Sequence, residues 1–279
     1  RYEHVGQFFN QHGVAVLAQP FLVIWLVLTF WLNKTLSAEL PLHLLTFFVC
    51  ALMCHGELAR RRPDVSHLTE FYLWMSLGGV LGGAFNGLAA PLLFTSVYEY
   101  PLALILACLL RPRLDTEHEP HGRWIDVVLP LILFATLLPP NLRHGTYALD
   151  AGILAVSVYA TYSAFAIFSF RQRPLRFALG VAATLAAPLF ANGQIRELAH
   201  ERGFFGVSRV MLSADGEWHL LRHGTTLHGA QAVAPARWRE PQTYYSAQGP
   251  VGQVFSARAG REDVRNVGVI GHGAGATAW

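Results

Sequence analysis

Long apolar runs separated by short polar connections fill the chain as far as residue 191. A helix needs about 20 apolar residues to cross the hydrocarbon core of a bilayer. We therefore predict a polytopic α-helical membrane domain with about seven transmembrane helices, over residues 14–32, 40–58, 68–93, 97–110, 124–142, 147–170 and 175–191. The fourth and seventh runs are short, and the fifth contains prolines, which membrane helices tolerate where neighbouring groups satisfy the freed carbonyls.

Arginine clusters indicate which ends of these helices face the cytoplasm. They lie after the second run (60–62), after the fourth (111 and 113), and between the sixth and seventh (171, 173 and 176). If every run spans, the N-terminus is cytoplasmic and residues 192–279 emerge on the outer face. If 175–191 is re-entrant or interfacial, those residues stay in the cytoplasm, and hydropathy leaves both alternatives open.

After residue 191 the pattern changes to alternating apolar and polar positions, which is typical of half-buried strands. Strands are predicted at about 204–212, 217–223 and 225–231, and Asp215-Gly216 is a strong hairpin signal. Residues 251–259 fit a helix or a strand. The predicted domains are a transmembrane domain (1–191), a β-rich part (192–265), and a strand with a glycine-rich turn that begins a Rossmann-like core (266–279).

Composition supports the membrane assignment and excludes other classes. Charged residues make up 14% and hydrophobic residues 53% of the chain, the mean hydropathy is +0.33, and the net charge is +3. These values exclude a disordered chain and a basic nucleic-acid binder, so the lipid bilayer is the expected partner and nucleic acid is not. We expect a bacterial-type inner (cytoplasmic) membrane protein that crosses the membrane several times.

Several polar or small residues lie within the apolar runs. Glu57, Glu70 and Asp126 lie near the predicted cytoplasmic ends, where interfacial hydration explains them, and Glu70 could pair with an arginine of 60–62. Cys50, Cys54 and His55 do not have the spacing or the four ligands of a structural zinc site, so no metal is expected. The glycine-rich helix 76–91 should let another helix approach closely, from this bundle or from another membrane subunit.

The segment Gly271-His272-Gly273-Ala274-Gly275 follows a predicted strand, which is the context of a nucleotide-binding turn. By itself this motif is also compatible with an ordinary glycine-rich turn. His223 and His228 flank a Gly-Thr-Thr turn, where they could line a ligand site or be partly exposed hairpin residues.

Several longer strings, taken in order, resemble one family. They are CHGELARRRPDVSHLTEFYLWMSLGGVLGGAFNGLAAPLLF (54–94), GFFGVSRV (203–210), RHGTTLHGAQ (222–231), EPQTYYSAQGPVGQVF (240–255) and VGVIGHGAGATAW (267–279). Together they are similar to the membrane-embedded, spermidine-synthase-like family, in which a major-facilitator-type membrane domain is fused to a polyamine aminopropyltransferase domain. The similarity covers nearly the whole chain.

The resemblance implies a β-hairpin region followed by a Rossmann-like methyltransferase-type core. It also implies aminopropyl transfer from decarboxylated S-adenosylmethionine, as a co-substrate, to a polyamine; no covalently bound cofactor is expected. By similarity, Gln231 and Gly271, Gly273 and Gly275 would contact the nucleoside, and Tyr244 or Tyr245 the polyamine. The family's catalytic aspartate and ribose-binding acid have no counterpart in these residues, so no catalytic residue is assigned.

Three functions follow from these observations. The chain is expected to be part of a membrane-bound aminopropyltransferase-like protein that is not competent by itself, because the amine must lose a proton to a carboxylate that these residues do not supply. The first alternative is a non-catalytic accessory subunit of a larger membrane complex. The second is a polyamine or small-molecule transporter, which rests on fold analogy alone.

Overall fold

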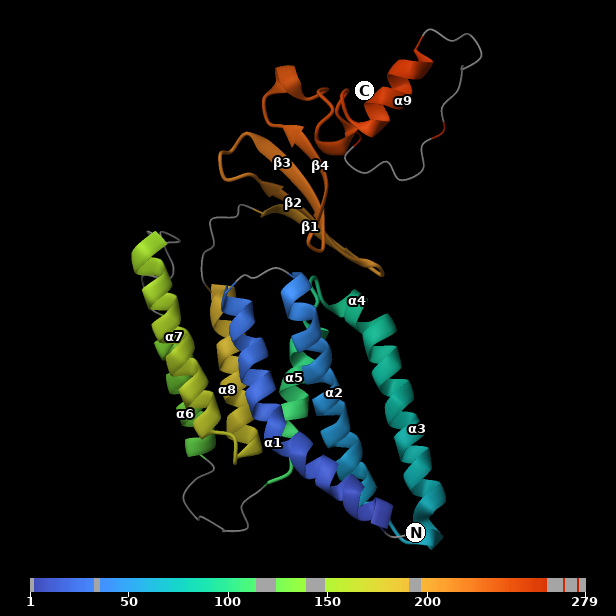
Figure 1. Cartoon of the computed structure of the whole chain (residues 1–279), viewed down its shortest axis with the longest axis vertical. Coiled ribbons are helices and arrows are strands. Elements are labelled where there is room, and N and C mark those ends of the chain that lie inside the picture. The colour runs from blue at the N-terminus through green and yellow to red at the C-terminus, as the bar shows by residue number, and fades with distance from the viewer. Residues whose placement is uncertain are drawn as a thin grey trace. The chain divides into compact units, whose positions relative to one another are not determined.

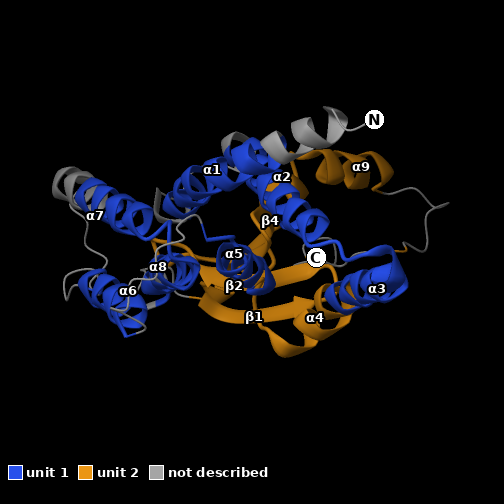
Figure 2. Ribbon diagram, turned by 90° about the horizontal axis from the view of Figure 1, so that it is seen from below, with its two compact units in different colours: residues 1–82, 98–192 blue, residues 83–97, 193–279 orange. Residues whose placement is uncertain are grey.

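The computed structural model describes residues 3–32, 36–113, 124–138, 149–190, 197–259, 268 and 275 (Figure 1). The chain divides into two compact units, coloured separately in Figure 2. Unit 1 comprises residues 1–82 and 98–192, and unit 2 comprises residues 83–97 and 193–279. Each unit is described by itself below.

Unit 1 is built from helices that follow the apolar runs. They are α1 (Glu3–Leu32), α2 (Leu36–Arg60), the 3₁₀ turn η1 (Val65–His67), most of α3 (Leu68–Ala84), α5 (Glu99–Leu109), α6 (Ile125–Thr136), α7 (Leu149–Ser169), α8 (Pro174–Ala186) and the 3₁₀ turn η4 (Ala187–Phe190). Pro174 occupies the first turn of α8, where its fixed φ suits a helix and its missing N–H costs nothing.

The core of unit 1 lies where α1, α6 and α8 meet. Leu26, Leu133 and Phe177 are at most 1% exposed and contribute to one apolar cluster. Many large apolar side chains of the same helices are exposed, including Phe47, Phe48, Leu73 and Trp74. Large exposed apolar side chains in this number are unfavourable in water and are typical of surfaces that contact lipid or protein.

The prediction of about seven transmembrane helices was wrong. Among the described residues, only three helical segments are long and apolar enough to cross a bilayer: Gln11–Thr29, Glu39–Arg60 and Val65–Leu93. The fourth, fifth and seventh runs form helices of 11, 12 and 13 residues, which at 1.5 Å per residue reach only roughly 17–20 Å against a hydrocarbon core about 30 Å thick. The apolar runs are therefore longer than the α-helices that form within them.

Unit 2 combines the end of the third apolar run and the connection after it (residues 83–97) with residues 193–279. Its first segment contains the π-helical turn η2 (Phe85–Ala89) and the short helix α4 (Ala90–Leu93). Its sheet has four antiparallel strands in the order β1 (Glu197–Gly203), β2 (Gly206–Leu212), β3 (Trp218–His223) and β4 (Thr226–Ala232). The turns η5 (Pro235–Arg237) and η6 (Thr243–Tyr245) and the helix α9 (Pro250–Arg258) follow.

The Asp215-Gly216 hairpin is observed between β2 and β3. Asp215 Oδ1 accepts hydrogen bonds from the Ser213 hydroxyl and the Glu217 N–H, and Gly216 has a φ of 75°, which favours glycine. Strand β1 was not predicted, and the segment 251–259, for which helix and strand were both open, largely coincides with the helix α9 (Pro250–Arg258). The expected start of a Rossmann-like core at 266–279 lies outside the described residues except for Gly268 and Gly275, so a four-stranded antiparallel sheet is what the described structure contains.

Candidate functional site

Two of the residue groups expected to bind ligand meet on strand β4. The Tyr244 hydroxyl donates a hydrogen bond to the backbone carbonyl oxygen of His228, at 2.9 Å. Tyr244 lies in η6, and its ring centroid is 4.4 Å from that of Tyr245. The bond therefore fixes the tyrosine pair against the strand that carries Gln231, three residues beyond His228.

Local backbone irregularities shape this region. Leu227 pairs with Arg222 and Gly229 with Leu221, so His228 is the extra residue of a β-bulge in β4. Thr243, which precedes the tyrosine pair, has a φ of 59°, an uncommon conformation for a residue with a side chain. Bulges and positive-φ residues are often found next to binding sites, where they orient side chains.

Gln231 lies directly opposite His219 of β3, which in turn lies opposite Leu212 of β2. Directly paired residues of an antiparallel sheet project from the same face. Gln231 is half-buried, and Tyr244 is 45% exposed. This combination leaves both an amide and a phenol available to a ligand at the edge formed by β4.

The pKa of the Tyr244 hydroxyl is raised, first by its side-chain hydrogen bond with Tyr245 and then by partial burial. A raised pKa keeps the phenol protonated at neutral pH. Tyr244 can therefore act as a hydrogen-bond donor, whereas a role as a general base would require the opposite shift.

His223 has a structural role. Its Nδ1 lies 3.2 Å from the Ser208 hydroxyl, and its Nε2 lies 3.2 Å from the Phe205 carbonyl oxygen. A carbonyl can only accept, so Nε2 carries the proton and Nδ1 accepts from Ser208. Both ring nitrogens are thus used to close the β1–β2 turn, and the ring is 6.0 Å from that of His228.

The glycine motif is described only at its end. Gly275 has a φ of 77°, a conformation that favours glycine, whereas Gly271 and Gly273 lie outside the described residues. The structure therefore joins the tyrosine pair to strand β4, which carries Gln231, whereas most of the predicted nucleotide-binding turn lies outside the described residues.

Unit 1 contains a buried arginine, Arg111, which hydropathy and charge patterns indicated only as a residue at a membrane boundary. Arg111 is 3% exposed, and its Nη1 donates to the Val16 carbonyl at 2.5 Å and to the Gln19 side-chain oxygen at 2.9 Å. Its Nε donates to the Arg171 carbonyl at 3.0 Å. These neutral acceptors join α1 to the ends of α5 and α7, so Arg111 acts as a connector between helices.

A second buried polar contact joins α6 to α8. Asp126 Oδ1 accepts from Arg176 Nε at 2.9 Å and from its Nη2 at 2.8 Å. The two side chains are 12% and 17% exposed. The main partner of Asp126 is therefore the guanidinium of Arg176, and not water at a membrane surface. Periodicity could not reveal this pairing, because 50 residues separate the two groups.

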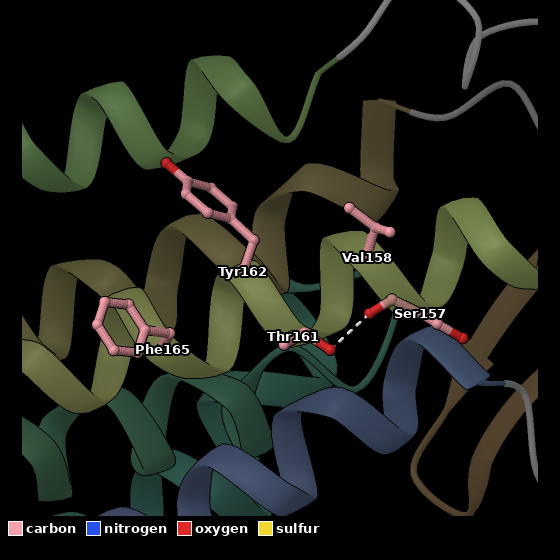
Figure 3. Close-up of a pocket in the computed structure, with 5 residues that line it drawn as sticks. All are labelled: Ser157, Val158, Thr161, Tyr162 and Phe165. Carbon is pink, nitrogen blue, oxygen red and sulfur yellow. Dashed lines mark hydrogen bonds between the residues drawn. The ribbon is translucent and has the colours of Figure 1, made fainter.

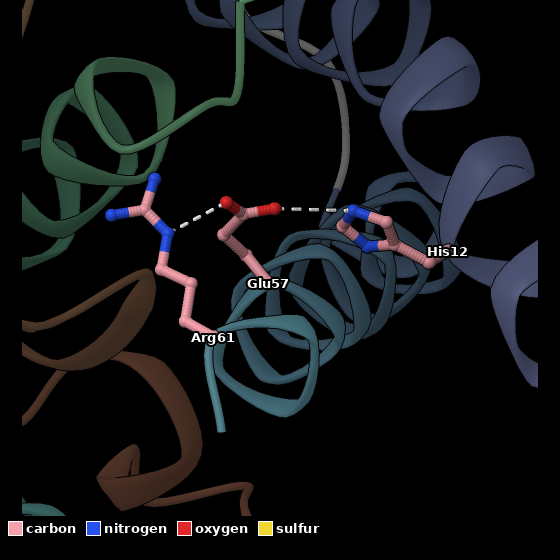
Figure 4. Close-up of polar contacts among 3 residues, drawn as sticks. All are labelled: His12, Glu57 and Arg61. Atoms are coloured by element: carbon pink, nitrogen blue, oxygen red, sulfur yellow. Dashed lines mark hydrogen bonds and ion pairs between the residues drawn. The ribbon is translucent and has the colours of Figure 1, made fainter. Parts of the chain in front are cut away.

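A third contact connects α1 to the end of α2 (Figure 4). His12 Nε2 is 3.5 Å from Glu57 Oε2, and the other Glu57 oxygen accepts from Arg61 Nε at 2.7 Å. His12 packs over Gly56, where a Cβ would lie 2.9 Å from its Cγ. Glu70, for which pairing with an arginine of 60–62 was one possibility, accepts a hydrogen bond from Trp74 Nε1.

A shallow apolar pocket runs along α7 (Figure 3). It is lined by Ser157, Val158, Thr161, Tyr162 and Phe165. The Thr161 hydroxyl donates to the Ser157 carbonyl at 2.8 Å, so it is already satisfied. One helix face without a convergent set of polar groups provides no chemistry for catalysis.

Within the described part of the chain, no three His, Cys, Asp or Glu side chains lie together as a metal site would require. Cys50 and Cys108 are buried free thiols and Cys54 is half-buried. Comparison with protein-family models, with curated proteins and with solved structures finds no match to this chain.

Proposed function

We propose that this chain is a membrane-anchored, spermidine-synthase-like protein whose extramembrane sheet supplies the ligand-contacting part of an aminopropyltransferase-type site. The ligands would be decarboxylated S-adenosylmethionine and a polyamine. The observation that carries the proposal is the hydrogen bond from Tyr244 to the His228 carbonyl, which holds the tyrosine pair beside the strand of Gln231.

The chemistry of the two groups fits these ligands. A half-buried glutamine amide both donates and accepts, as recognition of a nucleoside edge requires. Tyrosine rings attract cationic amines through their faces, and the Tyr244 hydroxyl can also accept a hydrogen bond from an ammonium group. Both roles are binding roles, and no catalytic residue is assigned.

Calorimetric titration of the purified full chain with decarboxylated S-adenosylmethionine, and separately with spermidine, tests this proposal. We expect Gln231→Ala to weaken binding of the nucleoside and Tyr244→Phe to weaken binding of the polyamine. Gln248→Ala is the matched control, because Gln248 is an exposed glutamine of the same unit. Absence of heat with both ligands, or equal losses in Gln231→Ala and Gln248→Ala, would contradict the proposal.

A second candidate function is favoured by a separate observation. In the Val65–Leu93 segment only 6% of the most apolar window is buried, against 56% in Gln11–Thr29. A Cβ added at Gly78, Gly79, Gly82, Gly83 or Gly87 would meet no atom within 4 Å. Small residues at four-residue spacing allow close helix approach in membranes, so we propose an accessory-subunit role in which α3 packs against another membrane subunit.

Cross-linking in native membranes distinguishes this role. A cysteine at position 82 should cross-link to a second polypeptide, and Gly82→Leu should abolish co-purification of that polypeptide. A chain that purifies alone after cross-linking in native membranes would contradict the accessory role and leave the ligand-binding proposal unaffected.

A further inference from the structure

Three arginines lie on one face of the β-sheet in unit 2. Arg209 of β2 is directly opposite Arg222 of β3 and His200 of β1, and Arg202 lies two residues beyond His200. Directly opposed residues project from the same face, and residues two apart along a strand do so as well. We call Arg202, Arg209 and Arg222 the arginine face.

Arg209 and Arg222 are like charges directly opposed on the sheet, and they differ in their ionic partners. The carboxylate of Glu197 lies beside Arg209: its Oε1 is 2.6 Å from His200 Nδ1, and its Oε2 is 3.8 Å from Arg209 Nε. Like charges directly opposed on a sheet are destabilising. Among the described residues Arg222 makes no side-chain hydrogen bond or ion pair, and its Nε is buried without an acceptor.

The unpaired, buried Nε of Arg222 indicates a missing acceptor. A buried polar group that lacks a hydrogen bond carries a desolvation cost of about 1–3 kcal/mol, and more when it is charged. Arginine forks match the oxygens of phosphate groups, which accept two parallel hydrogen bonds. Access to the face is open, because the side chain of Arg209 is 41% exposed.

The arginine face also lies close to a candidate membrane boundary. Arg202 Nη1 donates to the Ser96 carbonyl, and Arg209 Nη2 donates to the Ser96 hydroxyl at 3.2 Å. Ser96 lies three residues after Leu93, the last residue of the candidate span Val65–Leu93. Three extended residues reach at most about 11 Å, while the headgroup layer adds about 5–8 Å on each side of the hydrocarbon core.

We propose that Arg202, Arg209 and Arg222 bind a phosphate group, supplied by the headgroup of an anionic phospholipid. The site rests on the membrane placement in the proposed function, and it is independent of the nucleoside and polyamine. Its location within reach of the span end favours lipid phosphate over free phosphate, because headgroups are concentrated at that depth. Basic residues at this level gain from the negative surface potential as well as from direct contact.

The test measures lipid binding by the full chain. The purified protein is reconstituted in phosphatidylcholine nanodiscs, and retention of added phosphatidylglycerol is titrated by native mass spectrometry. We expect Arg222→Gln and Arg209→Gln each to weaken phosphatidylglycerol binding by roughly fivefold. Arg258→Gln is the matched control, since Arg258 is an exposed arginine of the same unit.

Further measurements distinguish lipid phosphate from free phosphate and define the results that would overturn the site. Inorganic phosphate added to millimolar concentration should not displace the lipid; displacement would overturn the lipid assignment in favour of free phosphate. Equal retention of phosphatidylcholine and phosphatidylglycerol, or equal losses in Arg222→Gln and Arg258→Gln, would overturn the site. Arg222→Lys keeps the charge but lacks the two-donor fork, so its binding should lie between that of the parent protein and that of Arg222→Gln. This variant covers the case in which Arg222→Gln does not fold.

Failure of this site and failure of the proposed function give different results. A protein that inserts into phosphatidylcholine nanodiscs but does not prefer phosphatidylglycerol refutes the site alone. A protein that prefers phosphatidylglycerol but gives no heat with decarboxylated S-adenosylmethionine or spermidine refutes the ligand-binding proposal alone. A protein that does not enter the nanodiscs refutes the membrane placement and the site with it.

Discussion

The ion pair between Asp126 and Arg176 predicts a large and non-additive effect on stability. Arg176 donates two hydrogen bonds to one Asp126 oxygen, at 2.8 and 2.9 Å, and less than a fifth of either side chain is exposed. Asp126→Asn removes the negative charge while retaining the shape of the side chain. The Arg176 guanidinium then stays inside the helix bundle without a counter-charge.

The expected magnitude follows from burial. Breaking one partner of a buried ion pair costs about 3–5 kcal/mol, whereas replacing both by apolar residues of similar size is close to neutral. A change of 1 kcal/mol shifts the melting temperature by about 2–4 °C in a chain of this size, so Asp126→Asn should melt roughly 6–20 °C lower. The double variant Asp126→Leu/Arg176→Met should melt close to the parent protein.

The assay is thermal unfolding of the detergent-solubilised full chain, followed by retention of the monodisperse peak in size-exclusion chromatography. Arg237 and Glu240 provide the control, because their atoms also approach to 2.8 Å but their side chains are 46% and 48% exposed. An exposed pair contributes about 0–1 kcal/mol, so Glu240→Gln should be nearly silent. Two outcomes would refute the reasoning. One is a melting temperature that falls as little in Asp126→Asn as in Glu240→Gln. The other is a double variant whose melting temperature falls by the sum of the decreases in the two single variants.

Three further predictions follow from local geometry. Gly56→Ala should destabilise the α1–α2 contact by about 1–3 kcal/mol, because the added Cβ would meet His12. Gly13→Ala is the control, because a Cβ there would meet no atom within 4 Å, and thermal melting curves of the two variants are compared. Hydrogen bonds from the Ser213 hydroxyl and the Glu217 N–H lower the pKa of Asp215 below 3.8. A lowered folded-state pKa stabilises above the unfolded value, so the advantage of the parent protein over Asp215→Ala should be full at pH 6 and disappear as the pH falls below 3.8; circular dichroism melts between pH 3 and 7 measure it. A Ser256→Cys variant should react with a membrane-impermeant maleimide in intact cells if the sheet is external, whereas a Ser66→Cys variant should react only after lysis; the reverse pattern would contradict that orientation.

Sequence patterns predicted the positions of helices and strands more successfully than they predicted contacts between residues that are far apart in the chain. Apolar runs located the helices, and alternation with Asp215-Gly216 located β2 and β3, because these signals arise from neighbouring residues. Strand β1, with sequence ELAHERG, was missed because it is polar and mostly exposed and has no alternating pattern. The number of transmembrane helices was overestimated because hydropathy reports apolar composition and not the length of the helix. The helices α5, α6 and α8 end after 11 to 13 residues, which is too short to span.

The candidate site was predictable only in part, for a related reason. Gln231 and Tyr244 were proposed from the resemblance, whereas the bond that joins the tyrosine to β4 lies next to a turn at Thr243 with a positive φ, which no pattern predicted. The pairing of Asp126 with Arg176 and the arginine face depend on contacts between residues far apart in the chain. Such contacts are set by packing and register, which single-sequence patterns do not encode.

The contacts of Ser96 bear on which proposed function is the better one. Because Arg202 and Arg209 bond to Ser96, the sheet would lie on the membrane face at which the Val65–Leu93 segment ends, provided that this segment spans the bilayer. If that segment spans, Arg60–Arg62 lie at its opposite end, and the positive-inside rule assigns that end to the cytoplasm. The sheet is then external, away from a cytoplasmic supply of nucleoside, which favours the accessory role. A cytoplasmic sheet would require that the π-helical turn Phe85–Ala89 interrupts the span, and it would favour ligand binding. The side on which Ser256 can be labelled therefore decides between the two functions before any ligand is tested.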